Sequence, residues 1–211
     1  MHAPLAEASS RLRLLRLAVV AVVSGALLGG ANSLSNVLGS PYSPRSLSQN
    51  GIFVLEVLAA VLGTAWAWAL TAFGAGWWAR RTWAGPVVGV AALLIADVTY
   101  YLSDSLTGYA EFSNNELLAW GILAVPAGLV MGLLGALTAQ RRRWSIVPGL
   151  MGPAAVALLA ARTGSDHIQP WPTVLTWTIA ATLTVAVVAS WVRNMASSTP
   201  AEVVPGTDRP G

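Results

Sequence analysis

Long apolar segments are the feature that most restricts how this chain can fold. Six of them lie at 17–38, 51–79, 84–102, 117–139, 144–161 and 174–192. A lipid bilayer takes about 20 helical residues to cross, and a backbone in lipid must satisfy its polar groups within helices or closed barrels. None of the segments alternates apolar and polar residues as a barrel strand does. We therefore expect an all-α, polytopic membrane protein with six transmembrane helices in one bundle.

Charge is scarce in this chain, and its scarcity excludes several classes of protein. Charged residues make up 10% of the chain and hydrophobic residues 55%, whereas about a quarter of a soluble domain is charged. All 12 basic residues are arginine, and they flank the apolar segments, where they orient helices. A nucleic-acid partner is therefore not expected, despite the net charge of +3. The absence of cysteine excludes disulfides and thiolate metal sites.

The arginines also predict which side of the membrane each loop occupies. Six crossings bring ten of the 12 arginines to one side and leave Arg45 and Arg162 on the other. Loops on the cytoplasmic side are enriched in basic residues, so both termini are expected in the cytoplasm of a cell with a bacterial plasma membrane. The ten are Arg11, Arg13, Arg16, Arg80, Arg81, Arg141, Arg142, Arg143, Arg193 and Arg209.

Three regions follow from this topology. We expect a cytoplasmic N-terminal segment over 1–16, a six-helix transmembrane domain over 17–193 and a disordered cytoplasmic tail over 194–211. The tail is rich in proline, serine and threonine and lacks apolar periodicity. A cleaved signal peptide is the alternative for the first segment, although an apolar run that continues to Leu38 is long for a signal.

Small residues recur at four-residue spacing in several predicted helices. Helices in lipid associate through such residues because backbones can then approach closely, so the spacing predicts packing within the bundle, with a homo-oligomer contact as the alternative. The positions are Gly25 and Gly29, Gly85 and Gly89, Gly128 and Gly132, and a stripe of Ala60, Gly63, Ala67, Thr71 and Gly74 in the second segment.

Prolines predict breaks in two of the helices. Pro126 lies in the fourth segment, and Pro148 and Pro153 lie in the fifth. Because proline removes a hydrogen-bond donor, we expect these helices to kink or break, and the second segment to remain unbroken. Transporters place broken helices at binding sites, but membrane helices also tolerate proline without a functional reason.

Two carboxylates lie inside the predicted spans, where an ionisable group costs about 2.5–3.5 kcal/mol on insertion scales. Glu56 heads the small-residue stripe of the second segment and is expected to point into the bundle. Asp97 and Asp104 are seven residues apart, so they share a helical face with a tyrosine one turn from each.

Together with two asparagines near the outer end of the first helix, these residues predict an acidic polar vestibule open to the outside. It would receive a cation, a proton or a small polar molecule; the alternative is that the acids are structural and pair with tyrosine or asparagine. The candidate binding residues are Asn32, Asn36, Glu56, Asp97, Tyr100, Tyr101 and Asp104.

Catalytic chemistry has no support in the sequence. The two histidines, His2 and His167, both fall outside the predicted spans, so neither histidine-based zinc coordination nor a serine–histidine pair at membrane depth is expected. No phosphate-binding loop or dinucleotide fingerprint is present. We expect no enzyme, no catalytic residues, no metal and no cofactor.

One stretch resembles a known family. GWWARRTWAGPVVGVAALLIADVTYYLSD, at 76–104, resembles uncharacterised actinobacterial multi-pass membrane proteins that are classed as a domain of unknown function. In that family an arginine-flanked loop leads into an apolar helix ending in a tyrosine pair, here Tyr100 and Tyr101, and the glycine-rich first helix at 25–32 fits as well. The resemblance implies an inner-membrane location and supplies no catalytic residues.

Two functions remain from the sequence. The first is a small transport or substrate-capture protein that uses the outer vestibule. Its architecture is similar to the substrate-capture subunits of energy-coupling-factor transporters, which dock on a partner through small residues of their first helix, here Ala21, Gly25 and Gly29. The alternative is a non-enzymatic accessory subunit bound to another membrane protein or an ATPase complex.

Overall fold

The computed structural model describes residues 3–39, 53–140, 142–163 and 171–196, and its regular elements there are all helical. This confirms the expected all-α class for the described part of the chain. The elements are α1 (Ala3–Gly39), α2 (Phe53–Leu62), α3 (Ala65–Ala79), α4 (Ala84–Thr107), α5 (Asn114–Thr138), the short 3-10 helix η2 (Arg143–Ser145), α6 (Ile146–Thr163) and α7 (Trp171–Ala196).

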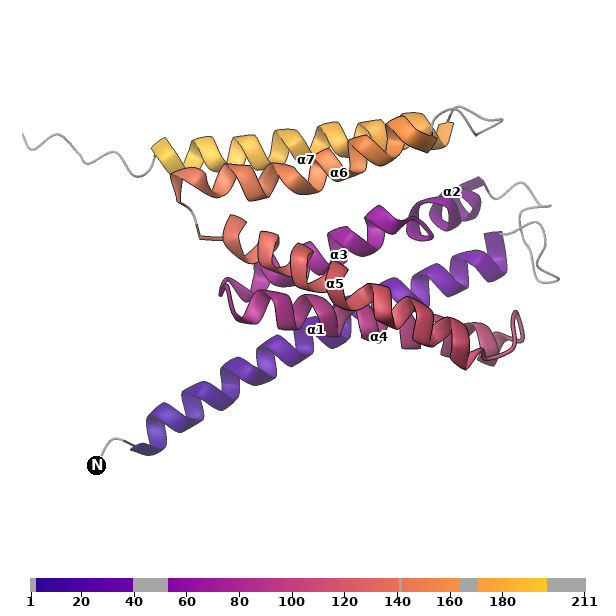
Figure 1. Ribbon diagram of the computed structural model, residues 1–211, viewed down its shortest axis with the longest axis horizontal. Helices are drawn as coiled ribbons and strands as arrows, with labels where there is room; N and C mark the ends of the chain where they lie inside the picture. Colours follow the sequence, from indigo (N-terminus) through magenta and orange to yellow (C-terminus); the bar gives the residue numbers. More distant parts are fainter. Residues whose placement is uncertain (1–2, 40–52, 141, 164–170, 197–211) are drawn as a thin grey trace, which may run out of the picture.

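The helices form an elongated bundle in which successive passes alternate in direction (Figure 1). With α2 and α3 counted as one pass, the N-terminus, the α3–α4 turn and the end of α7 lie at one end, and the α4–α5 turn lies at the other. Helix α4 packs against α1, α3 and α5, whereas α6 and α7 pair with each other along one side. Helix α4 is therefore the central element of the bundle.

Four helices are long and apolar enough to cross a membrane, namely α1 from Arg11 onward, α4, α5 and α7 from Thr173 onward. The bent pair α2–α3 makes a fifth candidate if it is one span, and α6 is not among the candidates. The described residues thus give four or five candidate spans where the sequence predicted six. The apolar helices indicate association with a membrane.

The second apolar segment is broken, contrary to the expectation of one continuous helix. Helices α2 and α3 meet at an angle of 70°, because Thr64 takes an extended backbone conformation before α3 begins. The break frees carbonyl groups at the end of α2, and side chains satisfy two of them. The Thr64 hydroxyl donates to the Val61 carbonyl at 2.6 Å, and the Trp68 indole donates to the Leu62 carbonyl at 3.1 Å.

The expected small-residue stripe of this segment is also wrong, because the break separates its members. Ala60, Gly63 and Gly74 are exposed, whereas Ala67 is buried in α3, together with Ala72 and Ala75, which lie outside the stripe. The prolines, by contrast, break nothing: α5 is continuous through Pro126 and α6 is continuous through Pro153. Pro148 lies in the first turn of α6, where a backbone donor has no partner within the helix anyway.

The glycine pairs pack within the chain, which confirms the intramolecular interpretation. Gly25 and Gly29 of α1 contact the backbone of α4 so closely that an added Cβ would collide with the Ala92 and Ala96 carbonyl oxygens. The first-helix face suggested for docking on a partner is thus covered by α4, with Ala21 buried beside it. Nearer the start of α4, Gly85 and Gly89 meet Gly128 and Gly132 of α5 in the same way.

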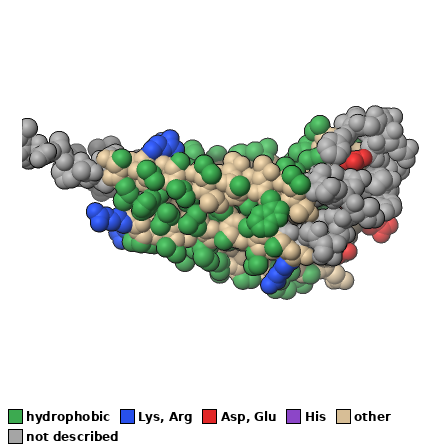
Figure 2. Space-filling model, turned by 90° about the horizontal axis from the view of Figure 1, so that it is seen from above, with side chains coloured by type: hydrophobic (Ala, Val, Ile, Leu, Met, Phe, Trp, Pro, Cys, Tyr) green, Lys and Arg blue, Asp and Glu red, His purple; other side chains and the backbone are tan. Residues whose placement is uncertain are grey.

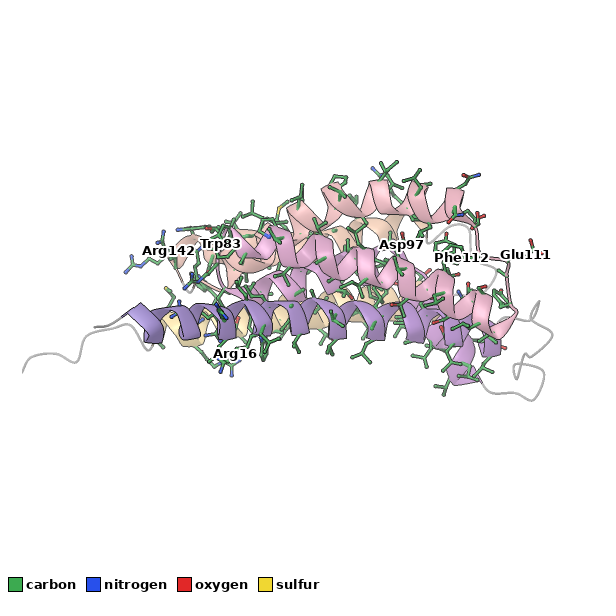
Figure 3. All side chains as sticks on the ribbon, turned by 90° about the horizontal axis from the view of Figure 1, so that it is seen from below. Arg16, Trp83, Asp97, Glu111, Phe112 and Arg142 are labelled. Carbon is green, nitrogen blue, oxygen red and sulfur yellow. The ribbon has the colours of Figure 1, made fainter. Side chains whose placement is uncertain are left out.

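Basic and acidic residues separate along the bundle. Most arginines gather at the end that holds the N-terminus and the acidic side chains gather at the other, with apolar side chains between (Figure 2). Arg162, in the last turn of α6, is the exception among the described arginines. We call the two ends the arginine end, which holds Arg142, and the acidic end, which holds Glu111 (Figure 3). Large apolar side chains stay exposed along the flanks, including Leu27, Val87, Leu118, Ile122 and Val185.

We predict that Gly132→Ala destabilises the protein, because the new methyl group would collide with the Gly85 carbonyl oxygen and both backbones would have to separate. Overpacking of this kind costs about 1–3 kcal/mol, which thermal unfolding in detergent would detect. The matched control is Gly74→Ala, whose methyl group meets nothing within 4 Å. Equal stability of the two variants would contradict the packing described for α4 and α5.

Candidate polar binding site

The candidate site is built on one face of α4 in the half nearer the acidic end (Figure 3). Asp97 and Asp104 are separated by two helical turns and therefore lie on the same face. Both are buried, with exposed fractions of 2% and 3%. The sequence predicted a vestibule open to the outside, but the structure encloses both carboxylates among packed helices.

Asp104 is held by a hydrogen-bond network that joins α4 to α1. The Ser33 hydroxyl donates to Asp104 Oδ1, and the Tyr100 hydroxyl lies beside the same carboxylate. Asn36 Nδ2 in turn donates to the Tyr100 hydroxyl at 3.2 Å. This network satisfies a buried carboxylate with neutral donors, which is how a charged group is commonly accommodated in an apolar interior.

Three aromatic rings line the site. Tyr100 meets Tyr101 edge-on, with ring centroids 5.2 Å apart, and Trp68 of α3 meets Tyr100 edge-on at 6.5 Å. Trp68 is the side chain that caps the end of α2, so the helix break and the tyrosine pair share one aromatic contact. Tyr101 follows Asp97 by one helical turn on α4, and its hydroxyl lies beside Glu116 at the start of α5.

Two buried polar atoms in this region have no hydrogen-bond partner in the described structure. They are Asp97 Oδ2 and Asn32 Oδ1. Asn32 lies on α1 near the break, since a Cβ at Gly63 would sit 3.7 Å from its Oδ1. Buried polar groups in folded proteins nearly always have partners, so these two enclosed atoms are exceptions within the described residues.

The fold joins four of the seven predicted candidates directly: Asn36 and Asp104 lie beside the Tyr100 hydroxyl, and Tyr101 packs edge-on against the Tyr100 ring. Asp97 shares the Asp104 face of α4, and Asn32 lies on α1 near the break, but Asp97 Oδ2 and Asn32 Oδ1 have no partner in the described structure. Glu56 lies in the first turn of α2 and is half-buried, and no hydrogen bond among the described residues joins it to the others. The prediction that Glu56 belongs to the same cluster therefore lacks geometric support.

Sequence reasoning missed three residues that shape the site: Ser33, Trp68 and Gly121. Ser33 follows Gly25 and Gly29 at the same four-residue step, so the small-residue face of α1 could have indicated it. The sequence did not indicate Trp68, because its hydrogen bond to the Leu62 carbonyl depends on the helix break. Gly121 was hidden because a lone glycine in an apolar helix has no local signal.

The electrostatics of the site are those of a cation-binding or proton-binding region. Every arginine whose exposure the structure describes is exposed, so no buried arginine neutralises Asp97 or Asp104 in that part of the chain. A multivalent metal centre lacks ligands, since no group of three or more metal-ligating side chains occurs among the described residues. A monovalent cation or a proton suits two separate carboxylates better.

The fold and this site define an all-helical protein with membrane character and a buried acidic site. Comparison with known proteins gives a family: the chain belongs to a family of unknown function (DUF6518), which matches residues 8–205. This confirms the resemblance to an uncharacterised family. No curated protein and no solved structure matches the chain.

We predict that Ser33→Ala destabilises the protein by about 1–3 kcal/mol, because the buried carboxylate of Asp104 loses a hydrogen-bond donor. Thermal or chemical unfolding of the purified protein would measure the change. Ser24→Ala is the matched control, since the Ser24 hydroxyl bonds only within its own helix, to the Val20 and Ala21 carbonyls. If both variants unfold like the original protein, the α1–α4 network has no energetic role.

Proposed function

We propose that this chain is an integral protein of the bacterial plasma membrane that crosses it six times with both termini in the cytoplasm. The separation of arginine and acidic ends supports this orientation, because basic residues concentrate on the cytoplasmic side. The sixth pass would be α6, which pairs with α7 and packs through Val156 against Trp66 and Ala67 of α3.

We further propose that the protein is a small transport or substrate-capture protein, not an enzyme. The observation that supports it best is the pair of buried aspartates on α4, which have no arginine partner in the described structure. An ionisable side chain in a membrane-spanning helix is costly, and such residues commonly mark a substrate or ion pathway. The break between α2 and α3 beside this face resembles the interrupted helices at transporter binding sites.

The alternative is a non-enzymatic accessory subunit of a larger membrane complex. An apolar groove between α1 and α3 supports this function, since it is lined by exposed side chains that another helix could cover. The lining includes Val19, Val23, Leu27, Gly74 and Trp78. An accessory subunit requires no small ligand, so a ligand-binding measurement distinguishes it from a substrate-capture protein.

The orientation predicts the outcome of cysteine labelling in intact cells. Because the chain has no cysteine, single cysteines report one position each. Glu111→Cys in the α4–α5 turn should react with a membrane-impermeant maleimide in intact cells, whereas Thr82→Cys in the α3–α4 turn should react only after the membrane is opened. Both native residues are exposed. The reverse labelling pattern would overturn the proposed orientation.

The proposed function predicts that a small solute stabilises the purified protein through Asp97. We would scan thermal unfolding against inorganic cations, organic amines, amino acids and water-soluble vitamins. Ligand at about 100 times its Kd adds about 2.7 kcal/mol to the free energy of unfolding, and this gain should vanish in Asp97→Asn. Glu111→Gln, an exposed carboxylate outside the network, is the control and should keep it.

The accessory alternative predicts the opposite result. No solute would shift the unfolding midpoint, and a second membrane protein would co-purify in mild detergent. A stabilising solute that acts equally on Asp97→Asn would also contradict the proposed site.

A further inference from the structure

The apolar groove between α1 and α3 is separate from the buried aspartates and has the size of a ligand site. Its volume is about 640 Å³, within the range of pockets that hold small molecules. A Cβ added at Gly74 meets no described atom within 4 Å, so the groove is open at that position. Its lining includes Val20, Leu27 and Leu28 of α1 and Thr71, Gly74 and Trp78 of α3.

The length of the groove favours a lipid chain over a partner helix. Along α1 it extends from Val19 to Leu28, which is about 14 Å at a rise of 1.5 Å per residue. The hydrocarbon core of a bilayer is about 30 Å thick, so one leaflet contributes about 15 Å. A partner helix that crosses the membrane would pack along a surface about twice as long, whereas an acyl chain of one leaflet matches the groove.

The face of α1 that lines the groove continues into two arginines. Leu27 and Val20 are seven residues apart on this face, and steps of four and seven residues back from Val20 reach Arg16 and Arg13. Residues at these spacings lie on one side of a helix. Both arginines are exposed, and Arg16 lies toward the arginine end of the bundle (Figure 3).

A third arginine lies at the same level on α3. Leu17 of α1 packs against a buried cluster that includes Ala79, the last residue of α3. Arg16 directly precedes Leu17, and the exposed Arg80 directly follows Ala79. The two arginines therefore flank the contact between α1 and α3 at the mouth of the groove.

An apolar groove with arginines at its mouth is complementary to an anionic phospholipid. A guanidinium group donates paired hydrogen bonds to phosphate oxygens, and basic pockets between membrane helices bind anionic headgroups. Trp78 lines the groove one residue before the end of α3, and tryptophan is enriched at the level of the headgroups.

We propose that the groove between α1 and α3 binds one acyl chain of an anionic phospholipid, whose phosphate contacts Arg13, Arg16 and Arg80. The inference goes beyond the proposed function. It requires the chain to lie in a membrane, but it requires neither a solute nor a role for the buried aspartates.

The test measures lipid binding to the detergent-purified, full-length protein by native mass spectrometry. The probes are dioleoyl phosphatidylglycerol and phosphatidylcholine with the same acyl chains, and the anionic lipid should bind more tightly. Arg16→Gln should weaken phosphatidylglycerol binding about fivefold, since one basic residue near an anionic membrane surface contributes about 1 kcal/mol. Arg142→Gln is the matched control, because Arg142 is an exposed arginine at the same end outside the groove, and it should bind phosphatidylglycerol like the original protein.

A second variant tests the groove itself. Gly74→Leu places a side chain in the open groove, and leucine is a better helix former than glycine. It should weaken phosphatidylglycerol binding about tenfold or more, whereas Ala181→Leu, at an exposed position of α7, should leave binding unchanged. Size-exclusion profiles identify a variant that fails to fold, and Thr71→Leu, at another lining position, then replaces Gly74→Leu.

Three results would overturn the lipid site. They are equal binding of the two lipids, unchanged phosphatidylglycerol affinity in Gly74→Leu, and an equal loss in Arg16→Gln and Arg142→Gln, which would mean that the lipid follows net charge. A dimer or a partner protein that Gly74→Leu dissociates would assign the groove to a protein helix and also overturn it. None of these results decides the proposed function, which depends on a solute that acts through Asp97.

Discussion

The close approach of α4 to α1 and α5 is the constraint on which the rest of the structure depends. Apolar helices in lipid have no hydrophobic driving force for association, so their contact relies on close van der Waals packing of small residues. Glycines of both neighbours allow backbone-to-backbone contact with α4, namely Gly25 and Gly29 of α1 and Gly128 and Gly132 of α5. Helix α4 is consequently the most enclosed of the candidate spans, and its polar face is shielded by its neighbours.

The enclosure of α4 allows its two carboxylates to remain away from lipid. An aspartate on a lipid-facing surface would be expelled, but one held between helices can remain if it finds partners. Ser33 continues the glycine face of α1 and supplies a partner to Asp104, so packing and hydrogen bonding arise from the same surface. Asp97 Oδ2 lies near Gly121 of α5 and is enclosed without a hydrogen-bond partner in the described structure. One helix thus has both a structural and a candidate functional acid.

The sequence predicted the features that depend on local periodicity and charge. Helical class, glycine packing and the shared face of Asp97 and Asp104 all follow from spacing along one segment. The sequence did not predict features that depend on tertiary contacts. The break at Thr64 involves Trp68, whose indole bonds to a carbonyl freed at the end of α2. Residue spacing also did not show that α5 and α6 continue through their prolines. The expected position of Glu56 rested on a stripe along one continuous helix, and that helix is broken, whereas the position of Gly121 near Asp97 exists only in the folded bundle.

The central claim is that Asp97 takes part in solute binding, and infrared difference spectroscopy tests it most directly. Adding a solute that stabilises the protein should alter a carboxylate stretching band of the protein in lipid, because the surroundings of the Asp97 carboxylate change. The account predicts that this band is absent from the difference spectrum of Asp97→Asn and retained in that of Glu111→Gln. A spectrum without a carboxylate band, or one in which Asp97→Asn retains it, would contradict the account.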